Sequence, residues 1–526
     1  MSVMPFIKNN ILYHTYPEVT LTEPDVLIIG SGIGSMSAGA ALSKKGYRVL
    51  LLEQHYIPGG LTHMFTRKGY NWESGIHGVG TVQENALVSK MYDSLASKKV
   101  VWKSLGDIYE EINFPNRKIN VHAGLDKYYN ELIKLFPNEK EKLLKYKSVL
   151  IQAASQSLPM YFMKRFSAKT AAVLNFILKI FHKDWWNITT DQILGKYNFT
   201  DELKTILSSQ LGYYGNLPNE SSFGIHSLVL DHYKNGSFFP AGGSKSITEG
   251  LLLTIIKAGG EIICKADVKK ILFEKNKAAG VELVNGARIL CKKVISGIGA
   301  KATTKLCEQN IKLKKWSDSI NKLKNSPSYI CLNVGFKGDI KKFGAEAKNR
   351  WYYSSWDLKE KYWDFENNPT PPIVYISFPS LKDSDNSTSS HTMEAIAFVE
   401  WEKFSKWKNT QFGKRPEDYN DFKKMLTKKF SDYLKTIMPD IMKMEAYSDL
   451  STPLSNSHFV RSNNGAIYGL EATPERFRNP HLRVITPAKG LFMTGIDTTA
   501  MGLAGGLVSG IMTASRIKFS ILKMLA

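Results

Sequence analysis

The chain has 526 residues, of which 43% are hydrophobic and 11% aromatic; this excludes an intrinsically disordered protein and allows about two or three domains. Its formal net charge of +22 indicates attraction to an anionic partner, either nucleic acid or a lipid surface, with solubility by charge as the alternative. The four cysteines form no C-x-x-C pair, so we expect no metal site, no disulfide framework and a reducing compartment.

The start of the chain predicts no membrane insertion. Residues 1–20 contain no apolar run long enough for a signal peptide. No stretch of the chain reaches 18 uncharged apolar residues, so we predict no transmembrane helix. We therefore expect a cytoplasmic protein.

A strand–turn–helix pattern follows. Residues Val26–Ile29 form a short continuous apolar run, which is typical of a strand buried on both faces. Gly30 then permits a tight turn, Ser31 follows, and Gly32 would let a pyrophosphate approach the backbone. Residues 33–45 have helical composition, and the N-terminal end of such a helix would face the phosphates.

The third glycine of the expected G-x-G-x-x-G motif is replaced by Ser35. This glycine normally allows the helix to pack closely on the strand. Gly34 stands beside Ser35 and Gly39 follows one turn later, so we expect the substitution to loosen the motif without breaking it. After a second predicted strand at residues 48–52, Glu53 lies near the ~20-residue spacing of a carboxylate that binds ribose. The pattern predicts nucleotide binding, and an ordinary glycine-rich turn is the alternative.

The segment after this acid distinguishes between NAD and FAD as the bound nucleotide. It reads EQHYIPGGLTHMFTRKGYNWESGIHGVG, and its glycine pair could run beside a cofactor that extends beyond the pyrophosphate. The run resembles the phytoene desaturase, carotenoid isomerase and retinol saturase family of flavoproteins, and is most similar to the retinol saturase-like branch. The resemblance implies an FAD cofactor and, in this part of the chain, these binding residues: Gly30, Ser31, Gly32, Gly34, Ser35, Glu53, Gln54, Gly59, Gly60, Leu61 and Thr62.

Residues 160–186 are a candidate membrane-facing segment. They mix apolar and aromatic residues with several lysines and an arginine and contain no acid before Asp184. Such a segment suits the headgroup boundary of an anionic membrane, and residues 516–526 have a similar character. The alternative is a core helix with a lysine-rich solvent face. Nucleic acid is not an expected partner, because no recognisable binding motif for it occurs.

The middle of the chain continues the resemblance. Residues 210–251 contain a G-x-Y-G and a Pro-x-Gly-Gly turn that are similar to the family, and residues 261–284 predict short strands separated by turns. In flavoproteins of this type the residue at the position of Val268 contacts the adenine through its backbone. Residues 394–404 follow a polar loop at 382–390 and alternate like a strand, which could belong to a sheet roofing the flavin.

The C-terminal region carries a second glycine-rich motif. Residues 491–494 predict a strand, a turn follows, and small residues from Gly502 onward predict a tightly packed helix. The resemblance implies that Asp497 sits at the FAD pyrophosphate and ribityl chain, with a simple turn or N-cap aspartate as the alternative. It also implies that the helix N-terminus faces the isoalloxazine, where it would stabilise negative charge. The cofactor residues implied here are Gly495, Asp497, Gly502 and Leu503.

Together these features predict an α/β fold. We expect a Rossmann-type FAD-binding domain of the amine-oxidase-like class with an interleaved α+β substrate domain. The FAD-binding domain is discontinuous and takes residues 22–95, 240–310 and 484–520. Residues 96–239 and 311–483 form the substrate domain.

The resemblance implies an FAD-dependent oxidoreductase acting on CH–CH groups. Its reaction would be saturation, desaturation or isomerisation of a carbon–carbon double bond in a carotenoid, retinoid or other polyene or isoprenoid lipid. We expect such an enzyme to lie on the cytoplasmic face of an anionic membrane. Candidates for a catalytic side chain are His77, Glu73 and Tyr468; no G-x-S-x-G or H-E-x-x-H motif occurs. The alternatives are an amine-oxidase-like flavoenzyme with another substrate and a non-catalytic lipid escort resembling the GDP-dissociation inhibitors.

Overall fold

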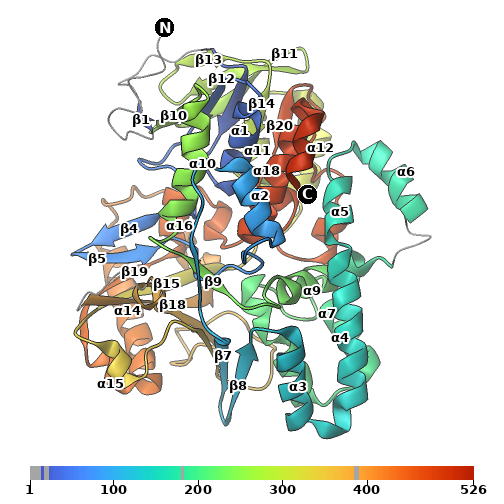
Figure 1. Cartoon of the computed structure of the whole chain (residues 1–526). Coiled ribbons are helices and arrows are strands. Elements are labelled where there is room, and N and C mark those ends of the chain that lie inside the picture. The colour runs from blue at the N-terminus through green and yellow to red at the C-terminus, as the bar shows by residue number, and fades with distance from the viewer. Residues whose placement is uncertain (1–12, 17–22, 179–182, 384–389, 526) are drawn as a thin grey trace.

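The computed structural model describes residues 13–16, 23–178, 183–383 and 390–525. A six-stranded sheet with its helices fills the upper half of Figure 1, and a seven-stranded sheet and a helical layer fill the lower half. Within the described ranges, no helix combines the length and apolar character needed to cross a membrane.

The six-stranded sheet is parallel throughout, in the order β1-β10-β3-β2-β14-β20. Its strands come from the beginning, the middle and the end of the chain: β1 (His14–Thr15), β2 (Val26–Ile29), β3 (Val49–Leu52), β10 (Glu261–Cys264), β14 (Val294–Ser296) and β20 (Leu491–Met493). The strands predicted at residues 26–29, 48–52 and 491–494 are thus confirmed to within a residue. The parallel order confirms the Rossmann-type α/β class.

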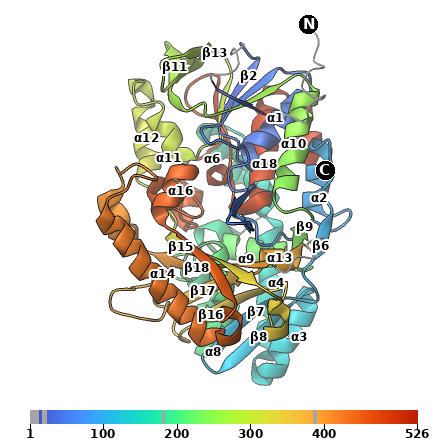
Figure 2. The same ribbon diagram turned by 90° about the vertical axis from the view of Figure 1, so that its left-hand side faces the viewer.

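Each central strand is buried on both faces. Val26 and Ile28 of β2 belong to one hydrophobic core, and Leu27 and Ile29 belong to another. Figures 1 and 2 show three helices covering the first face: α1 (Ile33–Ser43), α10 (Lys245–Lys257) and α18 (Gly502–Ile517). The second face is covered by a small sheet and two helices: β11 (Val268–Glu274), β12 (Lys277–Leu283), β13 (Arg288–Leu290), α11 (Ala300–Lys305) and α12 (Lys314–Asn321). Complete burial of one such aliphatic side chain contributes about 1.5–3 kcal/mol.

The seven-stranded sheet is mixed, in the order β19-β15-β18-β17-β16-β7-β8, and only β16 and β7 are parallel neighbours. Its strands are β7 (Ile108–Phe114), β8 (Arg117–His122), β15 (Ser328–Lys337), β16 (Asn349–Tyr353), β17 (Ile373–Ser377), β18 (Ser390–Val399) and β19 (Glu445–Ser451). The strand predicted at residues 394–404 is wrong beyond Val399. A 3-10 helix, Trp401–Trp407, follows because Phe404 and Trp407 turn into the core under α14 (Glu417–Ile437).

Helices form the remaining side of the molecule in Figure 1. They are α3 (Leu125–Leu135), α4 (Lys140–Ser155), α5 (Ser157–Met163), α6 (Ala168–Leu178), α7 (Thr190–Leu194), α8 (Asp201–Ser208) and α9 (Phe223–His232). The helix α2 (Leu87–Leu95) lies in the upper half, against α18. Short elements complete the chain: β4 (Met64–Arg67), β5 (Tyr70–Glu73), β6 (Trp102–Ser104), β9 (Phe238–Pro240), α13 (Pro379–Lys382), α15 (Pro439–Met442), α16 (Pro453–Phe459) and α17 (Pro474–Arg478).

The two predicted domains match these layers only approximately. The parallel sheet also contains β1, which precedes residue 22. Trp316 and Ile320 of α12 join the core of that sheet, although they lie beyond residue 310. The exact division into two domains stays a prediction.

Candidate active site

A cavity of about 1190 Å³ lies between the parallel sheet, the seven-stranded sheet and the helices α2, α5 and α9. Pockets for one small molecule usually span about 300–1,000 Å³. This cavity therefore has room for a large cofactor together with a substrate. All the predicted site residues line it except Ser35.

The first glycine turn forms one wall of the cavity. Gly30 leaves β2 with φ +86°, a conformation that favours glycine, and α1 begins three residues later. A Cβ atom on Gly32 would meet no protein atom within 4 Å, so the backbone there faces open space. An uncapped helix N-terminus beside open space suits an anionic phosphate.

Ser35 is accommodated by a glycine from a distant part of the chain. A Cβ atom on Gly297 would lie 1.9 Å from the Ser35 hydroxyl oxygen, so this oxygen occupies the space that Gly297 leaves free. The close approach itself belongs to Gly34, where a Cβ atom would lie 2.8 Å from the backbone of Gly495. Packing of the helix is therefore preserved without the third glycine of the motif.

Glu53 is held rigidly at the end of β3. One carboxylate oxygen accepts the backbone N–H of Ser31 at 2.9 Å and also its hydroxyl. The other oxygen accepts the backbone N–H of His55 at 2.8 Å. The Ser31 hydroxyl in turn accepts the N–H of Gly59 at 2.9 Å, which joins the two glycine turns. Glu53, the residue predicted to bind the ribose, is thus already held in place at the cavity wall.

The second glycine turn, Gly59–Gly60, is closed by the Thr62 side chain and packs against the first turn. The Thr62 hydroxyl donates to the carbonyl of Gly59 at 2.5 Å, and a Cβ atom on Gly60 would lie 2.9 Å from Gly32. Gln54 donates from its amide to the carbonyl of Phe459 at 2.7 Å. Leu61, Thr62 and Val268 line the cavity.

Asp497 links three segments of the cavity wall. Its carboxylate accepts the backbone N–H groups of Ala300 at 2.8 Å and Leu470 at 3.0 Å. The side chain is therefore already engaged. Gly495, Gly502 and Leu503 line the cavity beside it, where α18 presents its N-terminus. Together the two open helix N-termini and the glycine walls fit a flavin dinucleotide.

The predicted polar candidates His77 and Glu73 lie close together. The Nδ1 atom of His77 is 2.9 Å from a carboxylate oxygen of Glu394, and the His77 ring contacts Tyr375 edge-on. The other Glu394 oxygen accepts the backbone N–H of Glu73 at 2.7 Å. The Glu73 carboxylate accepts the N–H of Ser244 at 3.3 Å, and burial raises its pKa to about 8. Glu73 therefore retains a proton at neutral pH.

The third candidate, Tyr468, has a different environment. Its hydroxyl donates to the carbonyl of Gly212 at 2.9 Å, and its backbone N–H donates to Ser326. The hydroxyl proton is thus used within the protein, although the residue lines the cavity.

Sequence reasoning assigns Lys382 to a polar loop and misses its place in the site. The residue ends α13 and is only 3% exposed, while residues 384–389 of that loop lie outside the described ranges. Its Nζ donates to Asn349 at 2.5 Å, to Ser377 at 2.7 Å and to the carbonyl of His77. Burial lowers its pKa to about 7, and the nearby carboxylate of Glu394 opposes this shift.

Sequence reasoning also missed Glu110, which like Glu73 is a buried acid. It is fully buried and accepts from Trp351 at 2.6 Å, from Gln210 at 2.6 Å and from Tyr213 at 2.5 Å. Burial raises its pKa. Trp351 and Tyr213 line the cavity, so Glu110 fixes two aromatic walls. A signal existed, since two acids interrupt an otherwise apolar strand in the run IYEEINF.

The membrane-facing prediction for residues 160–186 is wrong for several of the side chains on which it rested. Lys164 and Arg165 are buried, and the Arg165 guanidinium donates to the Ser515 hydroxyl at 2.8 Å. Trp185 and Trp186 are buried as well. Arg165, one of the cations in the predicted membrane-facing segment, is thus bound by the C-terminal end of α18. Residues 179–182 lie outside the described ranges.

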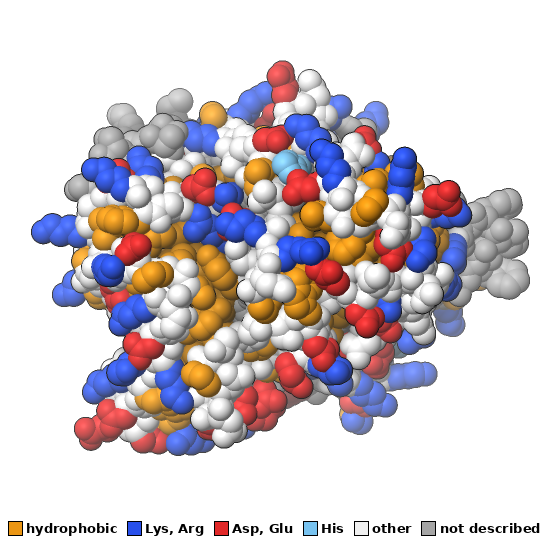
Figure 3. Space-filling view, turned by 90° about the horizontal axis from the view of Figure 1, so that it is seen from below, with side chains coloured by type: hydrophobic (Ala, Val, Ile, Leu, Met, Phe, Trp, Pro, Cys, Tyr) orange, Lys and Arg blue, Asp and Glu red, His pale blue; other side chains and the backbone are white. Residues whose placement is uncertain are grey.

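Surface charge on the lower face is mixed. Figure 3 shows lysine and arginine side chains interspersed with acidic ones, with hydrophobic side chains in a recess between them. On this face the net positive charge does not gather into one patch. Among the described residues, no group of three or more histidine, cysteine or acidic side chains could hold a metal ion.

Comparison with known proteins agrees with this site. The family described as "Flavin containing amine oxidoreductase" matches residues 36–518. The chain belongs to this family. Its members contain a flavin, so the chain is a flavoprotein oxidoreductase, and the predicted fold class is confirmed.

Individual relatives agree with the predicted resemblance. An all-trans-retinol 13,14-reductase of Danio rerio is 28% identical over 542 residues, covering 97% of this chain and 89% of that protein. A chloroplastic prolycopene isomerase of Daucus carota is 24% identical over 528 residues, covering 94% of this chain and 80% of that protein. The predicted resemblance to the retinol saturase and carotenoid isomerase group is confirmed.

A solved flavoenzyme shares the fold. Wild-type putrescine oxidase bound to putrescine aligns with a TM-score of 0.60 over 94% of this chain and 99% of that chain. The sequence identity is 13%, so this similarity concerns the fold alone.

Proposed function

We propose that the protein is an FAD-dependent oxidoreductase acting on a carbon–carbon double bond of a retinoid, carotenoid or other polyene or isoprenoid lipid. The carrying observation is one cavity that joins a dinucleotide cradle to walls of apolar and aromatic side chains. The relatives named as retinol reductase and prolycopene isomerase support the polyene class.

The extent of the cradle supports FAD as the flavin. Glu53, Asp267 and Val268 line the cavity beyond the first glycine turn, where the adenosine half of a dinucleotide would lie. A flavin mononucleotide has no such half. The backbone amides at the start of α18 line the cavity too and would favour negative charge on a reduced flavin.

Hydride chemistry is what a bound flavin supplies. The chain's own part is to orient the polyene and to hold a proton beside its double bond. Glu73 suits this role because it stays protonated at neutral pH. His77 suits it because its Nδ1 lies 2.9 Å from the Glu394 carboxylate and the residue lines the cavity.

We also propose a peripheral position on the cytoplasmic face of an anionic membrane; the exposed apolar side chains of α4 and α5 support the membrane contact itself. Leu144 and Ile151 of α4 lie seven residues apart on one helix face and are each 44% exposed. Leu158 and Phe162 of α5 are 39% and 38% exposed. A substrate dissolved in lipid would reach the cavity here, because Leu158 also lines it.

The decisive first experiment is the absorption spectrum of the purified protein before and after denaturation, followed by turnover with all-trans-retinol and with prolycopene. We expect a released FAD spectrum and a changed polyene product. A colourless protein that takes up no added FAD would favour the lipid escort. An FAD-loaded protein that oxidises amines and leaves polyenes unchanged would favour the amine-oxidase alternative.

A further inference from the structure

One arm of the cavity is apolar and leads to the surface. It runs between α2, α5, α9 and α18 and is lined by Leu87, Val88, Met91, Leu158, Tyr161, Ile225, Leu228, Val229, Leu503 and Val508. Leu158 of α5 lines the cavity and is 39% exposed, so the cavity reaches the surface at α5. An elongated apolar molecule is the natural occupant of such an arm.

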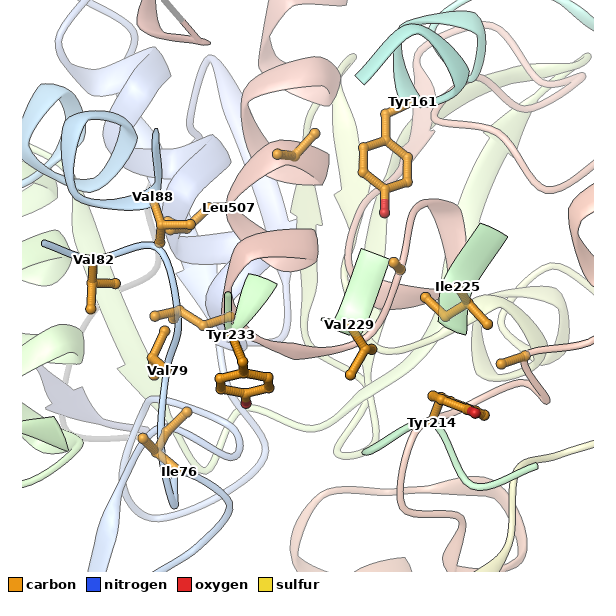
Figure 4. Close-up of a cluster of buried hydrophobic side chains, with 14 of the residues drawn as sticks. Ile76, Val79, Val82, Val88, Tyr161, Tyr214, Ile225, Val229, Tyr233 and Leu507 are labelled. Atoms are coloured by element: carbon orange, nitrogen blue, oxygen red, sulfur yellow. The ribbon is translucent and has the colours of Figure 1, made fainter. Parts of the chain in front are cut away.

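Tyr161 is the exception among these side chains. It is 3% exposed, and its hydroxyl has no hydrogen-bond partner among the described residues. Figure 4 shows the hydroxyl directed from α5 toward the α9 side chains Ile225 and Val229. Buried hydroxyls are normally paired, and an unpaired one calls for a ligand, a water or a structural explanation.

Other buried tyrosines in the same region follow the normal rule. Tyr214 lies 3.0 Å from Nδ1 of His226, and Tyr146 lies 2.9 Å from Nε2 of the same ring. These hydroxyls fulfil a purely internal role. Among the described tyrosines that line the cavity, Tyr161 shares an unpaired buried hydroxyl with Tyr375, whose ring packs against His77.

Tyr161 is not the only unpaired polar group in this part of the molecule. Trp186, whose ring centroid lies 6.1 Å from that of Tyr161, has an unpaired Nε1 among the described residues, and the buried Arg476 near Tyr161 has an unpaired Nε. A water that bridges Tyr161 to one of these donors is the competing explanation, and the binding test below decides between the two.

We propose that Tyr161 binds an oxygen atom of the substrate, so that the enzyme acts on an oxygenated polyene, an alcohol or carbonyl compound, in preference to a pure hydrocarbon. The inference rests on the proposed polyene function and narrows it. The Tyr161 hydroxyl donates to the ligand oxygen, while the apolar wall of the arm buries the hydrocarbon chain. Burial raises the pKa of Tyr161, so it keeps this proton at physiological pH.

The test compares Tyr161→Phe with wild type in the flavin-loaded full chain. The probes are all-trans-retinol and the matching hydrocarbon in which hydrogen replaces the hydroxyl, and affinity is read from quenching of tryptophan fluorescence. We expect wild type to bind retinol about tenfold more tightly than the hydrocarbon, the effect of one hydrogen bond. The variant should lose this preference and keep its affinity for the hydrocarbon.

Thermal unfolding of the apoprotein gives an independent readout. Tyr161→Phe should keep or raise Tm, because it removes an unpaired buried hydroxyl, whereas the control Tyr214→Phe should lower it. An equal loss in both variants would mean that Tyr161 has a protein partner, and would overturn the proposal.

The binding outcomes separate the two hypotheses. Equal wild-type affinity for both probes, or an equal change for both in the variant, would overturn the role of Tyr161 and leave the polyene function standing. Binding of neither probe to flavin-loaded wild type would overturn the polyene function, and the oxygenated substrate with it.

Discussion

His77 and Glu73 depend on side chains that the sequence places far away. Glu394 of β18 contacts the ring of one and the backbone of the other, and Lys382 of α13 contacts the carbonyl of His77. A buried carboxylate and ammonium stabilise each other only while both remain. The geometry therefore fixes the position and the charge environment of both proposed proton donors.

We expect His77→Ala to fold and to keep its flavin but to lose about 10²–10⁴-fold in turnover, the usual contribution of a positioned acid or base. The measurement is turnover per bound flavin, with flavin content read from absorbance. The matched control is His481→Ala, since His481 does not line the cavity. Wild-type turnover in His77→Ala would remove this residue from the mechanism.

The pKa of Glu73 predicts a pH dependence. Its neutral form donates a proton, and burial raises the pKa to about 8, so turnover should fall as pH rises through about 8. We expect Glu73→Gln to lower turnover and to lack this limb in its residual activity. An identical limb in the variant would assign it to another group.

Stability provides the second readout for Glu73. A carboxyl with a raised folded-state pKa favours folding below its ordinary value of 4.5 and loses that contribution as pH rises through about 8. Glu73→Gln should therefore gain stability relative to wild type between pH 6 and pH 9. Urea unfolding at both pH values measures it, and a constant difference would contradict the raised pKa.

At the scale of elements, the nucleotide cradle depends on the contact of α1 with the chain around β20. Gly34 touches the backbone of Gly495, whereas Gly32 faces only the open cradle. The two neighbouring glycines thus have separate roles, one in packing and one in cofactor access.

This difference gives a matched pair of variants. Gly34→Ala should destabilise the apoprotein by about 1–3 kcal/mol through overpacking and also lose flavin. Gly32→Ala should lose flavin with a smaller loss of apoprotein stability, because no protein atom lies within 4 Å of the added methyl group. Flavin content and apoprotein Tm measure the two effects. Full flavin binding by Gly32→Ala would contradict the proposal that the Gly32 backbone faces the bound cofactor.

At the scale of the whole molecule, the net charge of +22 is combined with an exposed apolar stripe on α4 and α5. Charge attracts a protein to anionic lipid only within about 8 Å at physiological ionic strength. Insertion of these apolar side chains into the bilayer would have to supply the part of membrane binding that persists at high salt.

We expect wild type to co-sediment with anionic vesicles more than with neutral ones. Combined replacement of Leu144, Ile151 and Phe162 by serine should abolish the part of binding that persists in high salt. Serine at Val284 and Ile311, exposed apolar residues elsewhere, is the control and should leave binding unchanged. Absence of wild type from both pellets would end the membrane proposal.

The sequence by itself determined the glycine turns, the strands around them and hence the flavin fold, because these are local patterns of a few consecutive residues. It also carried the resemblance that the family match confirmed. It identified His77 and Glu73 as candidate catalytic residues, but it did not indicate that Lys382 lies beside them.

Only the tertiary structure decided the rest. Gly297 makes room for Ser35, α18 buries Arg165, and Tyr161 is left without a partner in an apolar arm. Each of these depends on which distant segment packs against the residue. Burial and pairing are properties of that packing, and no spacing along the chain specifies them.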